Sequence, residues 1–318
     1  MPACQKTFTF APVYLILLIL SLSLSGANLL DMKYIRRFTI IVFGLLIGLT
    51  TPFQASAERL PVFDAHIHYS HDVWDAIAPA EAVKRLRQAG VSRALVSSSG
   101  DDGTQMLYQA APDFVIPSLR PYRKRGTIDT WIHDKTVVPY LKQRLKKYKY
   151  VAIGELHLKG DQASLPVVKA VIDLAREYEL ILHIHAEADV IDQVYQYYPE
   201  ARILWAHAGF EYAHVVSDLL DEHPRLWADL SFRREIFNNK QFLHGWQELL
   251  TRHSDRFMLG IDTYNPQRWL QLQRVMDWQQ ALLKALPEQV ARQIAYANGE
   301  RVFASLWQEK TKPRHVKP

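Results

Sequence analysis

Eight short apolar runs alternate with longer amphipathic segments along residues 61–285, and this alternation constrains the fold more than any other feature of the chain. Such alternation predicts βα units and a parallel sheet. We expect strands near 61–68, 91–97, 114–119, 150–156, 180–185, 201–207, 225–230 and 256–262. Helical patterns include 80–89, 135–147, 165–178, 188–198, 212–223, 241–252 and 266–285. Eight strands, each followed by a helix, predict an α/β fold of the (β/α)8 TIM-barrel class.

A histidine pair, His66 and His68, ends the first apolar run. Successive side chains of a strand point to opposite faces, so these two imidazoles should lie on the same side. Two imidazoles on one side can bind one metal ion. The pair alone is better explained by two incidental histidines, so the metal hypothesis needs further ligands from later strands.

Those further ligands occur where the later strands end. Active sites of (β/α)8 barrels are built at the carboxyl ends of the strands. The side chains at these ends are all of types that bind metals. They are His66, His68, Glu155, His185, His207 and Asp262. Six such residues at five strand ends predict a metal site.

The motifs around these residues resemble the amidohydrolase superfamily of metal-dependent hydrolases, closest to its amidohydrolase-related branch. The resemblance covers residues 61–305 and includes a C-terminal segment, Asn298 to Phe303, similar to the short helix that ends that branch. The motifs are Asp64-Ala65-His66-Ile67-His68, Gly154-Glu155-Leu156-His157, His183-Ile184-His185-Ala186, Trp205-Ala206-His207-Ala208-Gly209 and Gly260-Ile261-Asp262.

The resemblance implies a distorted barrel that holds one or two divalent metal ions. His66, His68 and Asp262 match the ligands of the more buried ion. His185 and His207 match residues that bind a second ion or, in one-metal members, polarise the substrate. Glu155 matches a bridging carboxylate, which favours two ions. Imidazoles and carboxylates suit zinc, manganese, iron or nickel, with zinc the expected ion, and without thiolates the site is not of the closed structural kind.

The reaction expected from this site is metal-assisted hydrolysis of an amide, lactone or other ester of a small molecule. Asp262 and His207 are the expected catalytic residues, with Asp262 carrying the proton from water to the leaving group. Alternatives are non-oxidative decarboxylation of an aromatic acid on the same site, a metal-dependent deoxyribonuclease resembling the TatD group, and a metal-holding protein without activity.

Substrate contacts are expected from the βα loops. Arg120, His157, Arg233 and Tyr264 lie near strand ends and are the candidates, and the arginines would suit an anionic small molecule. Ordinary loop charge explains each arginine equally well. Two neighbours of the motifs receive supporting roles: His183 as a buried hydrogen-bonding residue and Asp64 as a group that orients the first strand.

The first 57 residues are predicted to lie outside the barrel. From Met32, a basic segment, an apolar region (38–50) and Ala55-Ser56-Ala57 form a secretory signal, with cleavage expected after Ala57 and a periplasmic or secreted protein. We interpret 1–31 as a start assigned too far upstream or an extra hydrophobic segment. The barrel would occupy 58–308 and a basic tail 309–318.

Charge and cysteine content agree with this division. The net charge is +5 for the whole chain and +2 once residues 1–57 are removed. The tail, 309–318, carries a charge of +3 within this processed chain. The barrel is therefore close to neutral, and neither a stable nucleic-acid partner nor membrane attachment of the processed chain is expected. The single cysteine, Cys4, lies in the discarded segment, so the processed chain has no thiol.

Overall fold

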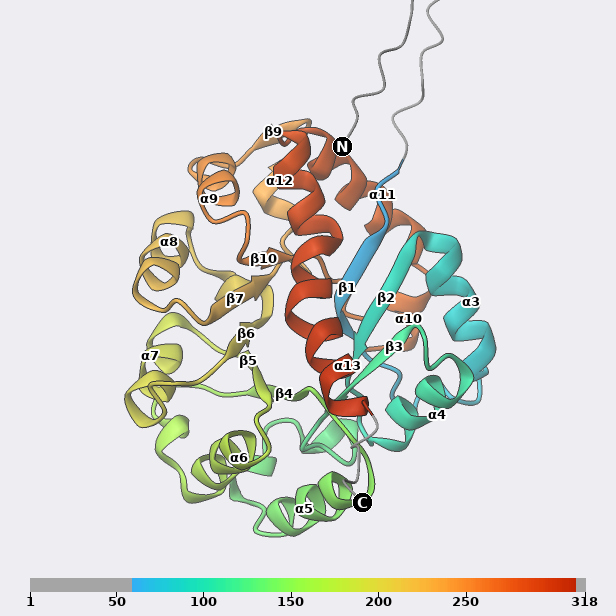
Figure 1. The fold of residues 1–318 in the computed structure, drawn as a ribbon, viewed down its shortest axis with the longest axis vertical. Coiled ribbons are helices and arrows are strands. Elements are labelled where there is room, and N and C mark those ends of the chain that lie inside the picture. Colours follow the sequence, from blue (N-terminus) through green and yellow to red (C-terminus); the bar gives the residue numbers. More distant parts are fainter. Residues whose placement is uncertain (1–58, 313–318) are drawn as a thin grey trace, which may run out of the picture. The chain divides into compact units, whose positions relative to one another are not determined.

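All eight predicted strands form, and they make one parallel sheet in sequence order (Figure 1). The computed structural model describes residues 59–312. The strands are β1 (Val62–Ile67), β2 (Val91–Val96), β3 (Val115–Leu119), β4 (Ala152–His157), β5 (Ile181–His185), β6 (Ile203–Trp205), β7 (Leu226–Asp229) and β10 (Phe257–Met258). Every residue of β1 and β3 is buried, as expected for strands covered on both faces.

The sheet curves until its two edge strands meet. A parallel bridge joins Asp64 of β1 to Leu259, just beyond β10, and the backbone N–H of Ala65 donates to the Leu259 carbonyl at 2.9 Å. The result is a nearly closed eight-stranded barrel. The predicted TIM-barrel class is therefore confirmed.

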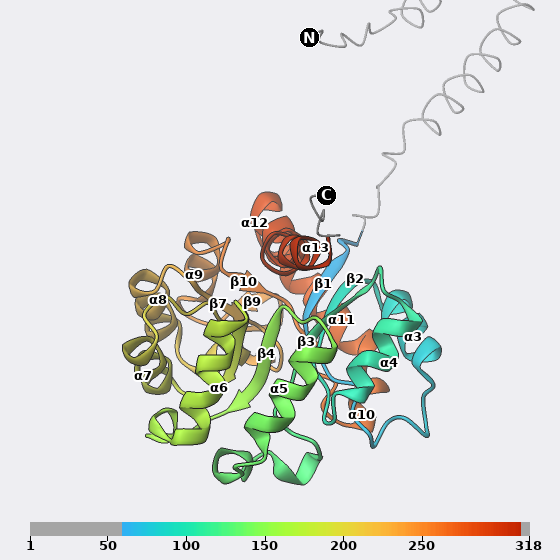
Figure 2. The ribbon, with the colours of Figure 1, turned by 60° about the horizontal axis from the view of Figure 1, so that its bottom comes forward.

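Helices surround the barrel (Figure 2). They are α3 (Pro79–Ala89), α4 (Asp102–Ala110), α5 (Val137–Lys147), α6 (Pro166–Glu177), α7 (Ala188–Tyr197), α8 (Ala213–Glu222), α9 (Trp246–Arg252), α10 (Pro266–Trp269), α11 (Leu272–Lys284), α12 (Glu288–Arg292) and α13 (Ser305–Thr311). In α6, Val168, Val171, Ile172 and Ala175 are buried. Their helical spacing makes one apolar stripe that packs on the barrel.

Three helical regions differ from the sequence prediction. Helix α4 occupies a segment to which the pattern assigned no helix. The helix expected over 241–252 begins only at Trp246, because a short hairpin, β8 (Phe237–Asn238) with β9 (Gln241–Phe242), and a left-handed Gly245 precede it. The helix expected over 266–285 is divided into α10 and α11. Local turns interrupt a pattern that periodicity alone treats as continuous.

A C-terminal helical segment crosses the strands in Figure 1 and covers the amino-terminal end of the barrel. Two π-helical turns, Gln293–Ala297 and Glu300–Ala304, connect α12 to α13. The ring of Phe303 stacks on that of Phe63 at 6.0 Å between centroids. Asn298 Nδ2 donates to the carbonyls of Ser254 and Phe257. This end is filled, which leaves the carboxyl end of the strands for chemistry.

Several predictions concern residues outside the described part of the chain. The proposed extension (1–31), the signal segment (32–57) and its cleavage point all lie there, as do residues 313–318. The expected barrel boundary at 308 falls within α13, which continues to Thr311. Among residues 59–312, no helix combines the length and apolarity needed to cross a membrane.

Candidate metal centre

Four donor atoms converge at the carboxyl end of the barrel. His66 Nε2 and His68 Nε2 lie 3.1 Å apart. Glu155 Oε2 lies 3.3 Å from the first and 3.2 Å from the second. Asp262 Oδ1 lies 3.9 Å and 3.4 Å from the same two nitrogens. The side chain of Asp262, at 8% exposure, is the most accessible of the four.

These distances fit a divalent cation. Donors arranged tetrahedrally around an ion such as zinc lie about 3.3–3.6 Å apart, given the usual bond lengths. Asp262 Oδ1 is buried and has no hydrogen-bond partner among residues 59–312. Buried carboxylate oxygens are almost always hydrogen-bonded or bound to an ion, so an unpaired one indicates a binding partner outside the protein chain. Because the donor set is two imidazoles and two carboxylates, a cation suits this place better than an anion.

Backbone contacts fix these ligands in place. The carboxylate of Asp64 accepts hydrogen bonds through Oδ1 from the backbone N–H groups of His66, at 2.9 Å, and Ile261, at 3.1 Å. The N–H of Asp262 donates to the His66 carbonyl at 2.7 Å. Asp64 thereby ties β1 to the loop after β10. Burial raises the pKa of Asp64 to about 7, although both backbone bonds act in the opposite direction.

A second group of imidazoles surrounds the other oxygen of Glu155. His185 Nδ1 lies 2.9 Å from Oε1, His207 Nε2 lies 3.6 Å away and His157 Nε2 lies 3.7 Å away. Burial opposes ionisation of Glu155, but attraction from His157 and His66 outweighs it and holds the pKa of this carboxyl well below its usual range. Glu155 is therefore an ionised carboxylate between two sets of imidazoles, as a bridging ligand would be.

His207 lies just after β6, in a tight turn rather than in the strand. His207, Ala208 and Gly209 all have left-handed backbone angles, with φ of 56°, 46° and 60°. A Cβ at position 209 would lie 2.2 Å from the indole of Trp205, so glycine is required there. Such conformations in residues other than glycine concentrate at functional sites. The turn directs His207 towards Glu155.

The two arginines predicted to contact substrate are both buried in protein contacts. Arg120 Nη2 lies 2.8 Å from Glu155 Oε2. Arg233 donates to the backbone carbonyls of His207 and Glu211, each at 2.9 Å. The guanidinium of Arg233 holds the turn after β6 rather than facing open space. Their contact with substrate stays a prediction, and the structure adds that both guanidinium groups have partners within the protein.

The other two predicted substrate residues are more accessible. Tyr264 is 43% exposed, and its ring lies 5.6 Å from that of Phe232. His157 is partly buried and stacks on His185 with 4.3 Å between ring centroids. The structure thus brings all six predicted ligands together and places Tyr264 at the edge of the same end of the barrel.

Sequence reasoning missed Asp229. Its carboxylate is fully buried at the end of β7, with Oδ2 3.0 Å from His66 Nδ1 and 3.5 Å from His183 Nε2. Burial opposes its ionisation, yet attraction from His66 keeps the pKa of Asp229 well below its usual range. The sequence feature that could have identified Asp229 is its position, since it is an acidic residue near the end of the predicted strand 225–230. His183 is buried beside this carboxylate, as expected, but its Nε2 has no hydrogen-bond partner among residues 59–312.

We expect Asp229→Asn to weaken zinc binding by about 10- to 100-fold, the usual loss when a group supporting a metal-binding histidine is changed. The amide keeps the shape but loses the charge that orients His66. Zinc titration of the chelator-treated protein measures the effect. Asp113→Asn is the control, because Asp113 is an exposed carboxylate that pairs with Arg87 at 2.9 Å. Equal affinities for both variants would exclude the supporting role of Asp229.

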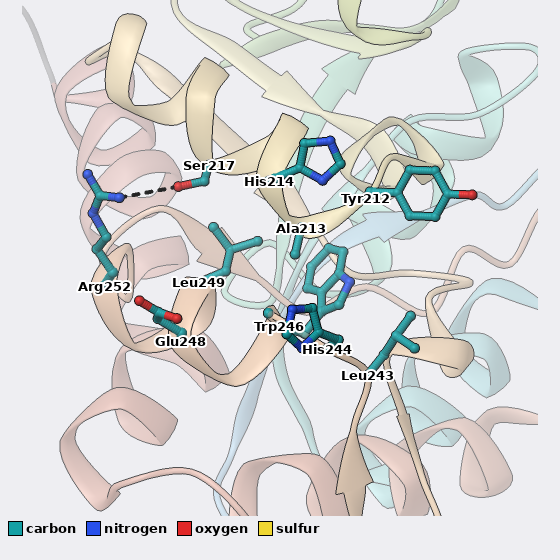
Figure 3. A pocket seen from close by; sticks show the side chains of 11 residues that line it. Tyr212, Ala213, His214, Ser217, Leu243, His244, Trp246, Glu248, Leu249 and Arg252 are labelled. Atoms are coloured by element: carbon teal, nitrogen blue, oxygen red, sulfur yellow. Dashed lines mark hydrogen bonds between the residues drawn. The ribbon is translucent and has the colours of Figure 1, made fainter.

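A surface hollow of about 510 Å³ lies between α8 and α9, away from these ligands (Figure 3). Its wall combines Tyr212 and His214 from the start of α8 with Leu243, Trp246 and Arg252. None of the six predicted ligands lines it. The chemistry therefore belongs to the barrel end and not to this hollow.

Comparisons with known proteins identify the family. No curated protein sequence matches the chain. The amidohydrolase family model, Amidohydro_2, matches residues 63–304. The chain belongs to the amidohydrolase family. The predicted resemblance is confirmed, and with it the class of enzyme: this amidohydrolase is a metal-dependent hydrolase whose described residues include candidate metal-binding groups.

Solved structures similar to this amidohydrolase show the same fold at low sequence identity. An uncharacterized TIM-barrel protein from Bordetella bronchiseptica has a TM-score of 0.57 at 12% identity, covering 78% of this chain and 99% of its own. A probable 2-pyrone-4,6-dicarboxylic acid hydrolase from Acinetobacter baumannii, with citric acid bound, has a TM-score of 0.54 at 11% identity, with coverages of 77% and 100%. A TatD family hydrolase from Entamoeba histolytica has a TM-score of 0.52 at 9% identity, with coverages of 77% and 99%.

Proposed function

We propose that this amidohydrolase hydrolyses an amide, lactone or other ester bond of a small molecule, using one or two divalent cations, with zinc the expected ion. The observation that carries the proposal is the buried, unsatisfied Oδ1 of Asp262 beside the nitrogens of His66 and His68. A divalent cation held by these residues and Glu155 would polarise a carbonyl and lower the pKa of water towards neutrality.

Asp262 is the proton carrier in this proposal. Its Oδ1 faces the two histidines, and Oδ2 lies 3.8 Å from His207 Nε2. A carboxylate in this place can accept the proton of the attacking water and return it to the leaving group. The backbone N–H of Asp262 bonds to the His66 carbonyl, which holds the backbone of Asp262 in position beside the histidine pair.

His207 orients the reacting group in this proposal. Its Nδ1 lies 3.0 Å from the backbone carbonyl of Ser231. A carbonyl can only accept, so Nδ1 carries a proton, and in the neutral imidazole Nε2 presents its lone pair to the site. His207 thus acts as a ligand or an acceptor at the place where Glu155 and Asp262 meet.

Aromatic side chains border the site and would exclude water from the substrate. Phe210 is 54% exposed and stacks on His207 with 4.8 Å between centroids, while the ring of Phe232 approaches His207 edge-on at 5.8 Å. Because Arg120 and Arg233 are engaged within the protein, the proposal requires no negative charge on the substrate. A small molecule with an apolar or planar part suits this border.

The test is a panel of substrates given to the zinc-loaded protein. Hydrolysis of lactones, esters or amides, lost on chelation, is expected. Release of carbon dioxide from benzoate-type acids without hydrolysis would contradict the proposal and support a decarboxylase. Cleavage of DNA, with binding that weakens steeply as salt rises, would instead support the TatD-like alternative, for which the Entamoeba histolytica structure supplies a similarity of fold.

We also propose that the chain is exported and processed after Ala57. The support is the order of a basic segment, an apolar region and Ala55-Ser56-Ala57. An exported protein whose N-terminal sequence starts before Met32 would contradict this proposal.

A further inference from the structure

The last residue of β4, His157, is turned towards the carboxylate of Glu155 rather than towards solvent. The donor atoms of Glu155, His157 and His185 all lie within 4.8 Å of one another. We propose that His157 is a ligand of a second divalent cation, together with Glu155 Oε1 and His185 Nδ1. This inference rests on the proposed metal-dependent function and assigns His157 a role other than the substrate contact expected from sequence.

The pairing of β4 with β5 places the two histidines together. His157 and His185 are direct partners in the parallel register, so their side chains leave the sheet on the same side. Their rings stack with 4.3 Å between centroids and 23° between planes. Each ring presents one nitrogen to the same oxygen, at 2.9 Å for His185 and 3.7 Å for His157. These separations bracket the spacing of donors around a bound zinc, about 3.3–3.6 Å.

Tyr122 supplies the support that a metal-binding histidine requires. Its buried hydroxyl accepts the backbone N–H of His157 at 2.6 Å and lies 2.9 Å from Nδ1 of the same residue. Metal binding through Nε2 requires the tautomer in which Nδ1 carries the proton and donates it to the second lone pair of this oxygen, rather than the one in which the hydroxyl donates to Nδ1. Nε2 is then left with a free lone pair on the side of Glu155. Metal-binding histidines almost always donate their other ring N–H in this way.

The two sets of donors share only Glu155. Oε2 faces His66 and His68, whereas Oε1 faces His157, His185 and, at 3.6 Å, His207. Loss of His157 should therefore weaken one ion and spare the other. A substrate-binding histidine would change KM without changing metal affinity, so metal titration separates the two roles.

The experiment is zinc titration by calorimetry of the chelator-treated full chain. We expect two ions in the wild-type protein. In His157→Gln the tighter ion should keep its affinity, and the other should bind at least about tenfold more weakly. Tyr122→Phe keeps the ring, removes only the hydroxyl and should weaken the same ion, so it provides a second test if His157→Gln does not fold. His214→Gln, on the wall of the hollow in Figure 3, is the control and should match the wild type.

Each outcome of the titration supports or overturns either the role of His157 or the proposed function. A selective loss of the second ion in His157→Gln or Tyr122→Phe supports the inference. Two ions of unchanged affinity in both variants, or only one ion in the wild type, overturns the inference and leaves the proposed function standing. Absence of zinc binding in the wild-type protein overturns the proposed function itself.

Discussion

Replacement of Asp262 by asparagine should leave the fold intact and reduce kcat by at least a hundredfold. Asp262 Oδ1 is the buried carboxylate oxygen without a protein partner, 3.4 Å from His68 Nε2. An amide of the same shape cannot accept and return a proton, and loss of a positioned acid or base typically costs about 10²–10⁴-fold in rate. Asp262 has a φ of 54°, a conformation that asparagine tolerates better than most residues.

The measurement is kcat on the best substrate of the panel, with circular dichroism and thermal unfolding to verify folding. Asp277→Asn is the control, since Asp277 is an exposed carboxylate paired with Arg59. The control should keep wild-type turnover. A folded Asp262→Asn protein with full activity would remove Asp262 from the mechanism.

Replacement of Arg120 by methionine should produce the largest loss of stability. Arg120 and Glu155 form an ion pair at 2.8 Å, with side chains only 5% and 3% exposed. Removing one partner of a buried pair leaves an uncompensated charge and costs about 3–5 kcal/mol. The guanidinium also lies over the ring of Tyr122 at 4.7 Å, a contact that methionine would replace only in part.

Urea unfolding in the presence of a chelator measures this loss without a contribution from metal. Arg123→Met is the matched control from the same loop. Arg123 pairs with Asp134, and those side chains are 39% and 32% exposed, so the expected loss is below about 1 kcal/mol. Similar free energies of unfolding for the two variants would show that Arg120 is not needed to balance the charge of Glu155.

The barrel and the convergence of its candidate metal ligands were predictable because both depend on periodicity. Apolar runs identify strands, and in a barrel the strand ends meet, so His66, Glu155 and His207 could be expected near one another without knowledge of any contact. The same reasoning did not select Asp229, because burial and proximity to His66 are tertiary properties. Sequence shows where a strand ends, whereas the neighbours of each side chain depend on how the whole barrel packs.

For loop residues, the sequence position says little about the direction of the side chain, for a related reason. Arg120 and Arg233 follow strands, as substrate-binding residues often do, but each turns inward to a partner, Glu155 or the turn at His207. That turn depends on consecutive left-handed residues, which no hydrophobic pattern specifies. The helix expected over 241–252 is shorter in the structure because a local hairpin precedes it, and the hydrophobic pattern does not specify that hairpin either.

The most direct test of this account is the metal content of the purified protein, measured by mass spectrometry after preparation without chelator or added metal. We predict one or two equivalents of a divalent metal, lost when His66 and His68 are both replaced by alanine. A value close to two would also agree with Glu155 as a bridging ligand. Essentially no metal, even after incubation with zinc or manganese, would contradict the account.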